Sequence, residues 1–276
     1  MGITKWFLFL AICAGFDAAA QTRQPATPVM LPLHVQAKDF DVDNLGNIYL
    51  VTVTNQLIKY DAKGDSVATF NDTRKYGALY SIDVTNPLKI LLHYQDFGTL
   101  LVLERFLTQR TTIDLRRLNI MQAKAYCLSY DNHIWVYDEL AGRIRKIDEN
   151  GTALMESADL RLALEASISP ERMIDKDGKL YLYDDETGFY VFDYFGALQN
   201  KIPLLGWKHL TIEDGRIYGT TIDGLISYDT KTHIQTLLSF IDPSATGKTL
   251  YKNQKLYRLG KDNKITITAL ENKKVE

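Results

Sequence analysis

A two-segment motif returns along the chain at intervals of 37 to 46 residues, and this periodicity constrains the fold more than any other feature. Each copy has a polar residue, an apolar pair or triplet, a polar loop and a second apolar segment. The copies begin at residues 47, 89, 133, 179, 216 and 255, and read NIYLVTVTNQLIKYD, KILLHYQDFGTLLVLE, HIWVYDELAGRIRKID, KLYLYDDETGFYVFD, RIYGTTIDGLISYD and KLYRLGKDNKITITA. Short strands repeating near 40 residues predict the blades of a β-propeller.

The flanks of the motif supply two more strands per unit. A short apolar strand and a turn rich in Asp, Asn and Gly precede each copy, and a fourth strand such as Ser66–Phe70 follows most of them. The sixth unit lacks a fourth strand, which Pro28–Leu33 could provide. Such closure would leave no unpaired strand edge in the ring. We therefore expect an all-β, six-bladed β-propeller with four-stranded blades, built as a single domain over residues 27–270.

Three stretches carry a resemblance to a known repeat: DVDNLGNIYLVTVTNQLIKYDAKGDSV, SYDNHIWVYDELAGRIRKIDENG and IDKDGKLYLYDDETGFYVFDYFG. They resemble NHL-type repeats of six-bladed β-propellers, in which a D-x-x-G-x-I/L-Y-V core precedes an I-x-K/R-F/Y-D strand and a Gly turn. The resemblance implies the fold. It says little about function, because one fold supports many activities.

One segment, Leu154–Ser167, departs from the repeat. It combines strong helix formers with apolar residues at Leu160, Leu162 and Leu164, and Pro170 would end a helix there. The sequence predicts a short helix inserted between the third and fourth blades. Such a helix would either pack on the surface or dock a partner.

The first 20 residues are typical of an export signal. Lys5 precedes an apolar stretch, and Ala18-Ala19-Ala20 offers a cleavage site before Gln21. Residues 21–26 then form a linker, and residues 271–276 form a polar tail. A lipoprotein signal ending at Cys13 is the alternative, although Ile12 stands where a small residue is expected. We expect an exported protein of a Gram-negative bacterium, either periplasmic or secreted or associated with the outer membrane, that does not itself span the membrane.

Charge and composition exclude some functions. The chain has 32 basic and 34 acidic residues, a formal net charge of −2, and so lacks the basic excess that nucleic-acid binding requires. Its five histidines show no metal-binding spacing, and no G-x-S-x-G motif occurs. The chain has two cysteines, and Cys13 lies in the predicted export signal. The other, Cys127, lies in an apolar strand pattern and is expected to be a buried thiol. A non-catalytic protein without a cofactor is the favoured interpretation.

Two acidic groups have the spacing of candidate sites. The first comprises Asp43, Asp83, Asp175 and Glu213, which we place at one common repeat position where each caps a turn. The alternative is a divalent-cation site in the central channel, as in lactonase- or lyase-like enzymes on this fold. The second group lies in the loops between the second and third strands, which share a face with connectors that contain arginine and aromatic residues.

These loops and connectors predict a protein-binding face, because aromatic and arginine side chains are typical of interface hot spots. A solvated loop face with Trp207 packed on its own blade is the alternative. The candidate residues are Tyr76, Arg116, Arg117, Asp138, Asp184, Asp185, Trp207 and Asp223.

The function favoured by the sequence is an exported protein-binding or scaffold module, an accessory subunit of a bacterial envelope complex. Its partner would be a membrane or secreted protein. A divalent-cation-dependent lactonase- or lyase-like enzyme, or a binder of carbohydrate or another small ligand in the central channel, remains open.

Overall fold

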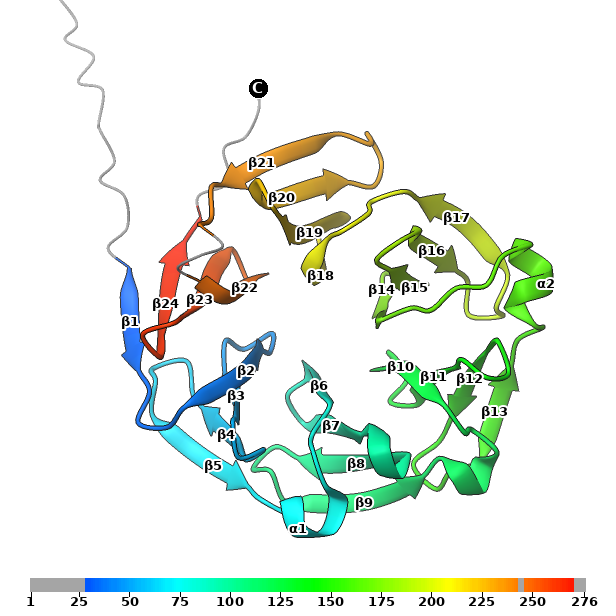
Figure 1. Ribbon diagram of the computed structural model, residues 1–276, viewed down its shortest axis with the longest axis horizontal. Coiled ribbons are helices and arrows are strands. Elements are labelled where there is room, and N and C mark those ends of the chain that lie inside the picture. The colour runs from blue at the N-terminus through cyan, green and yellow to red at the C-terminus, as the bar shows by residue number, and fades with distance from the viewer. Residues whose placement is uncertain (1–27, 243–245, 271–276) are drawn as a thin grey trace, which may run out of the picture.

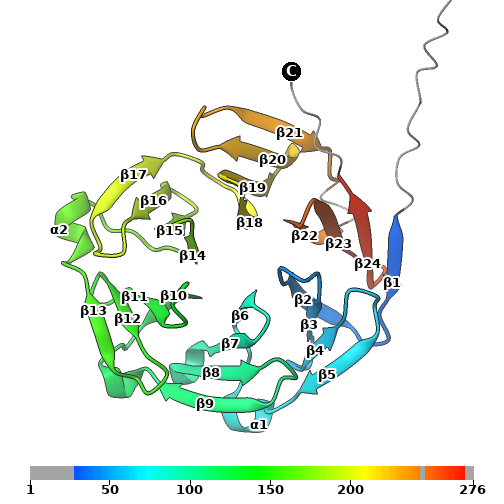
Figure 2. The ribbon, with the colours of Figure 1, turned by 180° about the vertical axis from the view of Figure 1, so that it is seen from behind.

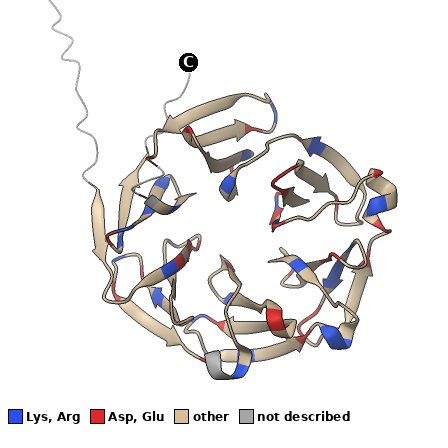
Figure 3. Ribbon diagram, in the orientation of Figure 1, with Lys and Arg blue, Asp and Glu red and all other residues tan. Residues whose placement is uncertain are grey.

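The protein is a six-bladed β-propeller in which six antiparallel sheets stand radially around a common axis (Figures 1 and 2). The computed structural model describes residues 28–242 and 246–270, so the predicted export signal, linker and polar tail lie outside the described residues. Acidic and basic residues are distributed around the whole ring (Figure 3).

Each blade has four strands, named A to D from the axis outward. The first three blades are formed by β2 (Ala37–Val42), β3 (Ile48–Thr52), β4 (Leu57–Tyr60) and β5 (Ser66–Phe70); β6 (Ser81–Asn86), β7 (Lys89–Tyr94), β8 (Thr99–Glu104) and β9 (Gln109–Asp114); and β10 (Ala123–Leu128), β11 (Ile134–Asp138), β12 (Arg143–Ile147) and β13 (Ala153–Glu156). The other three are formed by β14 (Arg172–Lys176), β15 (Lys179–Asp184), β16 (Gly188–Phe192) and β17 (Leu198–Ile202); β18 (Lys208–Glu213), β19 (Arg216–Thr221), β20 (Gly224–Asp229) and β21 (Gln235–Ser239); and β22 (Thr246–Lys252), β23 (Lys255–Gly260), β24 (Lys264–Ala269) and β1 (Val29–Pro32).

The repeated motif forms the B and C strands of every blade, and the predicted fold class is confirmed. Strand β3 is buried along its whole length, whereas strand β5 at the rim is mostly exposed. A central strand has a neighbouring blade on each face, so its residues are buried on both sides and read as a continuous apolar run. The core accordingly lies between blades, in clusters that each combine residues of two adjacent blades.

The two ends of the described chain meet in one sheet. Strand β1 pairs antiparallel with β24, with Val29 opposite Ile267 and Pro32 opposite Lys264. Leu31 packs against the hydrophobic cluster between the last and first blades. Backbone hydrogen bonds between segments far apart in sequence thus join the ends of the ring.

Two short α-helices occur among the described residues, α1 (Thr73–Tyr76) and α2 (Leu160–Leu164). Helix α2 lies between the third and fourth blades but is shorter than the helical pattern predicted, because residues 154–156 belong to strand β13. The Asp159 side chain caps its start by accepting from the Arg161 N–H, and Glu165 in a left-handed conformation ends it. Within the described segments, neither helix has the length and hydropathy that crossing a membrane requires.

Antiparallel pairing sends alternate loops to opposite faces of the disk. The B–C loops and the connectors between blades emerge on one face, which we call the connector face. The A–B and C–D turns emerge on the other, which we call the turn face. This division decides which side chains can act together.

Candidate functional site

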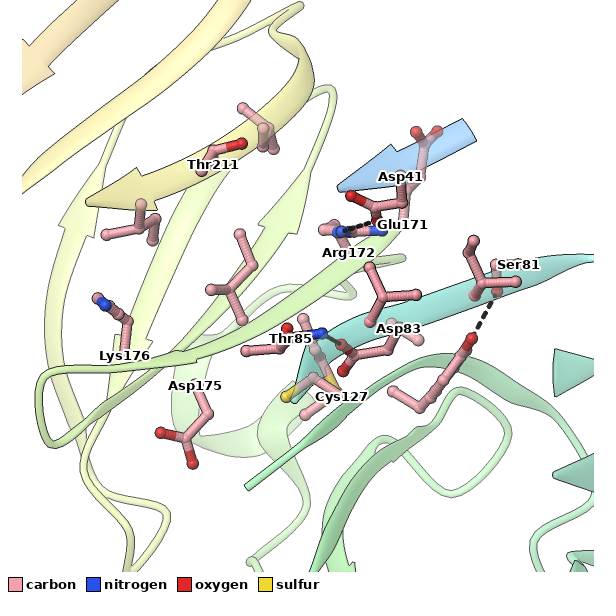
Figure 4. Close-up of a pocket in the computed structure, with 18 of the residues that line it drawn as sticks. Asp41, Ser81, Asp83, Thr85, Cys127, Glu171, Arg172, Asp175, Lys176 and Thr211 are labelled. Atoms are coloured by element: carbon pink, nitrogen blue, oxygen red, sulfur yellow. Dashed lines mark hydrogen bonds and ion pairs between the residues drawn. The ribbon is translucent and has the colours of Figure 1, made fainter. Parts of the chain in front are cut away.

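The axis of the propeller is bridged by an ion pair between opposite blades. Nη2 of Arg172, on inner strand β14, lies 3.5 Å from Oδ2 of Asp41, on inner strand β2 (Figure 4). Burial alone would lower the pKa of Arg172, but the carboxylates of Asp41 and Asp83 outweigh it and raise the pKa. The guanidinium therefore remains charged and connects the first and fourth blades.

Little room is left around this ion pair. The cavity lined by Asp41, Asp83 and Arg172 has a volume of about 100 Å³. Sites for small organic ligands usually occupy about 300–1,000 Å³. The space beside the ion pair therefore suits a few water molecules better than an organic ligand.

The acids predicted to cap turns have specific partners. Oδ1 of Asp43 accepts hydrogen bonds from the backbone N–H groups of Leu45 and Asn47, both at 2.9 Å, so its turn-capping role is confirmed. Asp83 caps its own turn through the N–H of Thr85 at 2.8 Å and also accepts from Leu128 of the next blade at 2.7 Å. Asp83 therefore also connects two blades.

The other two acids connect blades as well. Oδ2 of Asp175 accepts from Ser129 Oγ and Trp135 Nε1 in the preceding blade, both at 3.0 Å. Glu213 accepts from the backbone N–H of Asn253 in the following blade at 3.1 Å. These carboxylates are engaged in hydrogen bonds that hold adjacent blades in register.

The prediction that all four acids share one repeat position is wrong. Asp83 lies opposite Leu91, Asp175 lies opposite Leu180, and Asp43 lies beyond the last residue of β2. The inner strands end at different points relative to their hairpins, which the local sequence pattern does not reveal. Among the described residues, no group of three or more His, Cys, Asp and Glu side chains is arranged to hold a metal ion.

The two aromatic candidates for the protein-binding face are buried, so the expectation that they are exposed is wrong. Tyr76 is 5% exposed and packs against Tyr94, with ring centroids 5.3 Å apart. Trp207 is 3% exposed, and its ring fills the space that a Cβ at Gly219 would otherwise enter. Both side chains anchor connectors to their own blades, where apolar burial outweighs contact with solvent.

Two acidic candidates are also buried. Asp138 forms an ion pair with Arg145 at 3.5 Å. Asp184 accepts from the backbone N–H groups of Ser169 and Glu186; burial opposes ionisation, but these hydrogen bonds outweigh it and lower the pKa. These two carboxylates shape the B–C loops from within and are not offered to a partner.

The remaining candidates are accessible. Arg116, Arg117 and Asp223 are exposed, and Asp185 is half-buried in an ion pair with Lys208 at 2.9 Å. Arg116 also donates to the backbone carbonyl of Asp96 at 2.7 Å. The structure thus leaves an accessible polar subset of the predicted face.

The connector face carries a set of exposed apolar loop tips that the sequence prediction missed. Val53, Phe97, Leu140 and Ile222 occupy the B–C loops of four blades and are 52%, 53%, 63% and 86% exposed. All four tips emerge on the connector face, and loops held by a rigid scaffold are common sites of binding. The neighbouring connectors add Met121, Leu205 and Phe240.

An acidic residue adjoins most of these tips in sequence. Asp96 precedes Phe97, Glu139 precedes Leu140, and Asp223 follows Ile222. A single large apolar residue inside a polar B–C loop was the signal that could have identified this surface. We define Val53, Phe97, Leu140 and Ile222, with the acids beside them, as the loop-tip surface.

Comparison with solved structures confirms the fold. A streptogramin B lyase structure aligns with a TM-score of 0.59 at 15% identity, over 89% of this chain and 87% of that chain. A catalytically inactive histidine-to-alanine variant of virginiamycin B lyase from Staphylococcus aureus with quinupristin aligns with a TM-score of 0.59 at 13% identity, over 91% of this chain and 90% of that one. BamB from Moraxella catarrhalis aligns with a TM-score of 0.50 at 15% identity, over 83% of each chain.

The chain is a six-bladed β-propeller. No protein-family profile and no curated protein matches the sequence. At these identities, the likeness to solved structures extends to the fold alone, and function has to be argued from the site.

Proposed function

We propose that this protein is an exported, non-catalytic propeller whose loop-tip surface binds a protein partner of the bacterial cell envelope. The observation that carries the proposal is that four blades each place an exposed apolar B–C loop tip on the connector face. Function on such scaffolds commonly lies in loops that a rigid core positions.

The chemistry of the surface indicates what the partner presents. Burying one leucine- or isoleucine-sized side chain contributes about 1.5–3 kcal/mol before the entropic costs of association. The carboxylates beside Phe97, Leu140 and Ile222 favour basic residues in the partner. An apolar segment flanked by lysine or arginine therefore fits this face best.

The tips are held in place by the connectors beneath them. A ring carbon of Phe97 lies 2.9 Å from the position that a Cβ at residue Gly77 would occupy, so the ring packs closely against this connector. The backbone carbonyl of Leu140 accepts a hydrogen bond from the side chain of Arg161 in helix α2. Loops ordered in this way lose less conformational entropy on binding, which favours affinity.

The experiment is affinity capture of a tagged protein from the cells that naturally make it, followed by mass spectrometry. A triple variant, Phe97→Ser, Leu140→Ser and Ile222→Ser, removes three tips from the connector face. The matched control, Phe195→Ser, Leu88→Ser and Ile234→Ser, removes the same residue types from exposed positions on the turn face.

We expect the connector-face variant to lose a stoichiometric partner that the wild type and the turn-face control retain. A partner that the connector-face variant retains, or that both variants lose equally, would contradict the proposal. If the protein returns alone and a chelator lowers its melting temperature, the cation-dependent lactonase- or lyase-like enzyme becomes the better hypothesis.

A further inference from the structure

A stacked pair of tyrosines lies on the turn face between the third and fourth blades. Tyr130, in the turn after β10, is 71% exposed. Its ring lies nearly parallel to that of Tyr194, with centroids 5.0 Å apart and planes inclined by 12°. One face of the Tyr130 ring is thus covered by Tyr194, and the side chain remains largely open to solvent.

The base of this stack is fixed by hydrogen bonds. The hydroxyl of Tyr194 donates to Oδ1 of Asp175 at 2.5 Å, and Nε1 of Trp135 donates to Oδ2 of the same carboxylate at 3.0 Å. Burial, together with the Asp175 carboxylate, raises the pKa of Tyr194 above its usual value, so the hydroxyl stays protonated and donates. Tyr130 therefore rests on an ordered support.

The cation site of this aromatic cluster is already filled by the chain itself. Nζ of Lys146 lies 5.5 Å from the ring centroid of Tyr130, 4.7 Å from that of Trp135 and 5.6 Å from that of Tyr194. The carboxylate of Asp131 holds the same ammonium at 2.5 Å. A ligand that needs an empty aromatic cage for an ammonium group is therefore disfavoured.

A depression of about 520 Å³ adjoins the stack, and both tyrosines line it together with several polar residues. Lys176 follows Asp175 on β14 (Figure 4), and its ammonium group has no hydrogen-bond or ion-pair partner within the described residues. Hydroxyl, amide, ammonium and carboxylate groups surround the rest of the space. They belong to Thr85, Asn86, Ser129, Asn132, Lys176 and Asp177.

We propose that this depression binds a carbohydrate, with a pyranose ring stacked on Tyr130 and its hydroxyl groups hydrogen-bonded to the polar lining. A pyranose presents an apolar C–H face and a rim of hydroxyl groups. The first matches an exposed aromatic face, and the second matches amide, ammonium and carboxylate partners. The proposal concerns the turn face and is independent of the protein-binding surface.

Two other spaces within the described residues lack this combination. The cavity at the Arg172–Asp41 ion pair has a volume of about 100 Å³, too small for a sugar ring with its contacts. A second turn-face depression, of about 610 Å³, has Tyr257 as its aromatic lining residue, and that side chain is 2% exposed. An exposed stacking platform beside a roomy depression thus distinguishes the Tyr130 site from these two spaces.

The test uses maltotetraose, cellotetraose and chitotetraose as probes, with saturation-transfer NMR to detect binding and calorimetry to measure affinity. We expect at least one probe to bind the wild-type protein. Tyr130→Ala should weaken that binding at least about fivefold, because a stacked aromatic contact contributes on the order of a factor of ten. Tyr130→Phe keeps the ring and should stay within about twofold of wild type.

Two further variants complete the test. Phe195→Ala removes another exposed turn-face ring that does not line the depression, and should leave the affinity unchanged. Asn132→Gly removes an amide from the lining while tolerating the positive φ of 65° at that turn, and should weaken binding even if Tyr130→Ala fails to fold. Absence of binding by all three sugars, or unchanged affinity in both Tyr130→Ala and Asn132→Gly, would overturn the proposal.

Discussion

His93, a histidine buried in the second blade, should make the stability of the protein depend on pH in a specific window. The side chain is fully buried on β7, between the rings of Tyr80 and Tyr126, whose centroids lie 5.7 and 5.1 Å from that of the imidazole. Neither ring nitrogen has a hydrogen-bond partner among the described residues. Burial lowers the pKa of His93 from 6.5 to about 4.

The direction of the effect follows from proton binding. As the pH falls through 6.5, the unfolded chain protonates this histidine, while the folded chain leaves it neutral until about pH 4. The unfolded state thus binds more protons between these values, so stability is complete above pH 6.5 and is lost as the pH falls toward 4. A difference of about 2.5 units between the unfolded and folded pKa of His93 corresponds to a loss of about 3 kcal/mol in the free energy of unfolding.

The perturbation is His93→Leu, which replaces the imidazole with an apolar side chain of similar size. At pH 7.5, the variant should be as stable as the wild type or more so, because two unsatisfied buried nitrogens are removed. Between pH 7.5 and pH 4.5, the free energy of unfolding of the wild type should fall by about 2–3 kcal/mol more than that of the variant. Urea unfolding of both proteins at both pH values measures this difference. Partly buried His209, whose pKa burial also lowers to about 4, is present in both proteins and cancels in the comparison.

A second variant controls for the loss of any histidine. His34 is exposed, and His34→Leu should follow the wild-type pH dependence. The reasoning is refuted if His93→Leu and the wild type lose stability in parallel from pH 7.5 to 4.5, since burial of His93 would then contribute nothing to the slope.

Four further predictions concern closure, packing, processing and metal dependence. Deleting β1 (Val29–Pro32) should expose the edge of β24 and cause aggregation; a soluble protein with an unshifted melting curve would contradict the closure. Gly224→Ala places a Cβ 2.2 Å from a backbone carbonyl oxygen of β21 and should lower the free energy of unfolding by about 2–4 kcal/mol. Gly178→Ala has open space around it and should lower the free energy of unfolding by about 1 kcal/mol, and denaturant unfolding measures both values. Mass spectrometry of the mature protein should find Gln21 at its start, and a lipid on Cys13 would contradict soluble export. A chelator should leave the melting temperature of the purified protein unchanged, and a drop would favour the cation-dependent enzyme.

The strands and their number per blade were predictable because each depends on local pattern. The B and C strands need apolar residues on both faces, and the turns that contain Asp and Gly can be recognised in the local sequence. Cys127 was likewise predictable, since an apolar strand pattern around a thiol implies burial, and the residue is 4% exposed. Burial also raises the pKa of that thiol well above its usual value, as expected of an unreactive cysteine.

The candidate site was less predictable because exposure in a loop depends on what the loop packs against. Trp207 and Tyr76 look accessible in their connectors, yet each ring folds back onto its own blade. Trp207 packs against Gly219, and Tyr76 packs against Tyr94. Leu140 and Ile222 look like ordinary apolar residues, yet no neighbouring blade covers them. Composition alone does not distinguish these two cases.

The sequence by itself determined the repeating unit, the strand order within a blade and the all-β class, because these follow from short-range periodicity. Only the tertiary structure decided which residues meet across the ring: Arg172 with Asp41, 131 positions apart in the chain, and Tyr130 with Tyr194 beside the depression on the turn face. Closing the ring brings blades together that share no local sequence relation. Contacts across the axis and between blades therefore depend on strand register and hairpin length, which the local sequence pattern does not reveal.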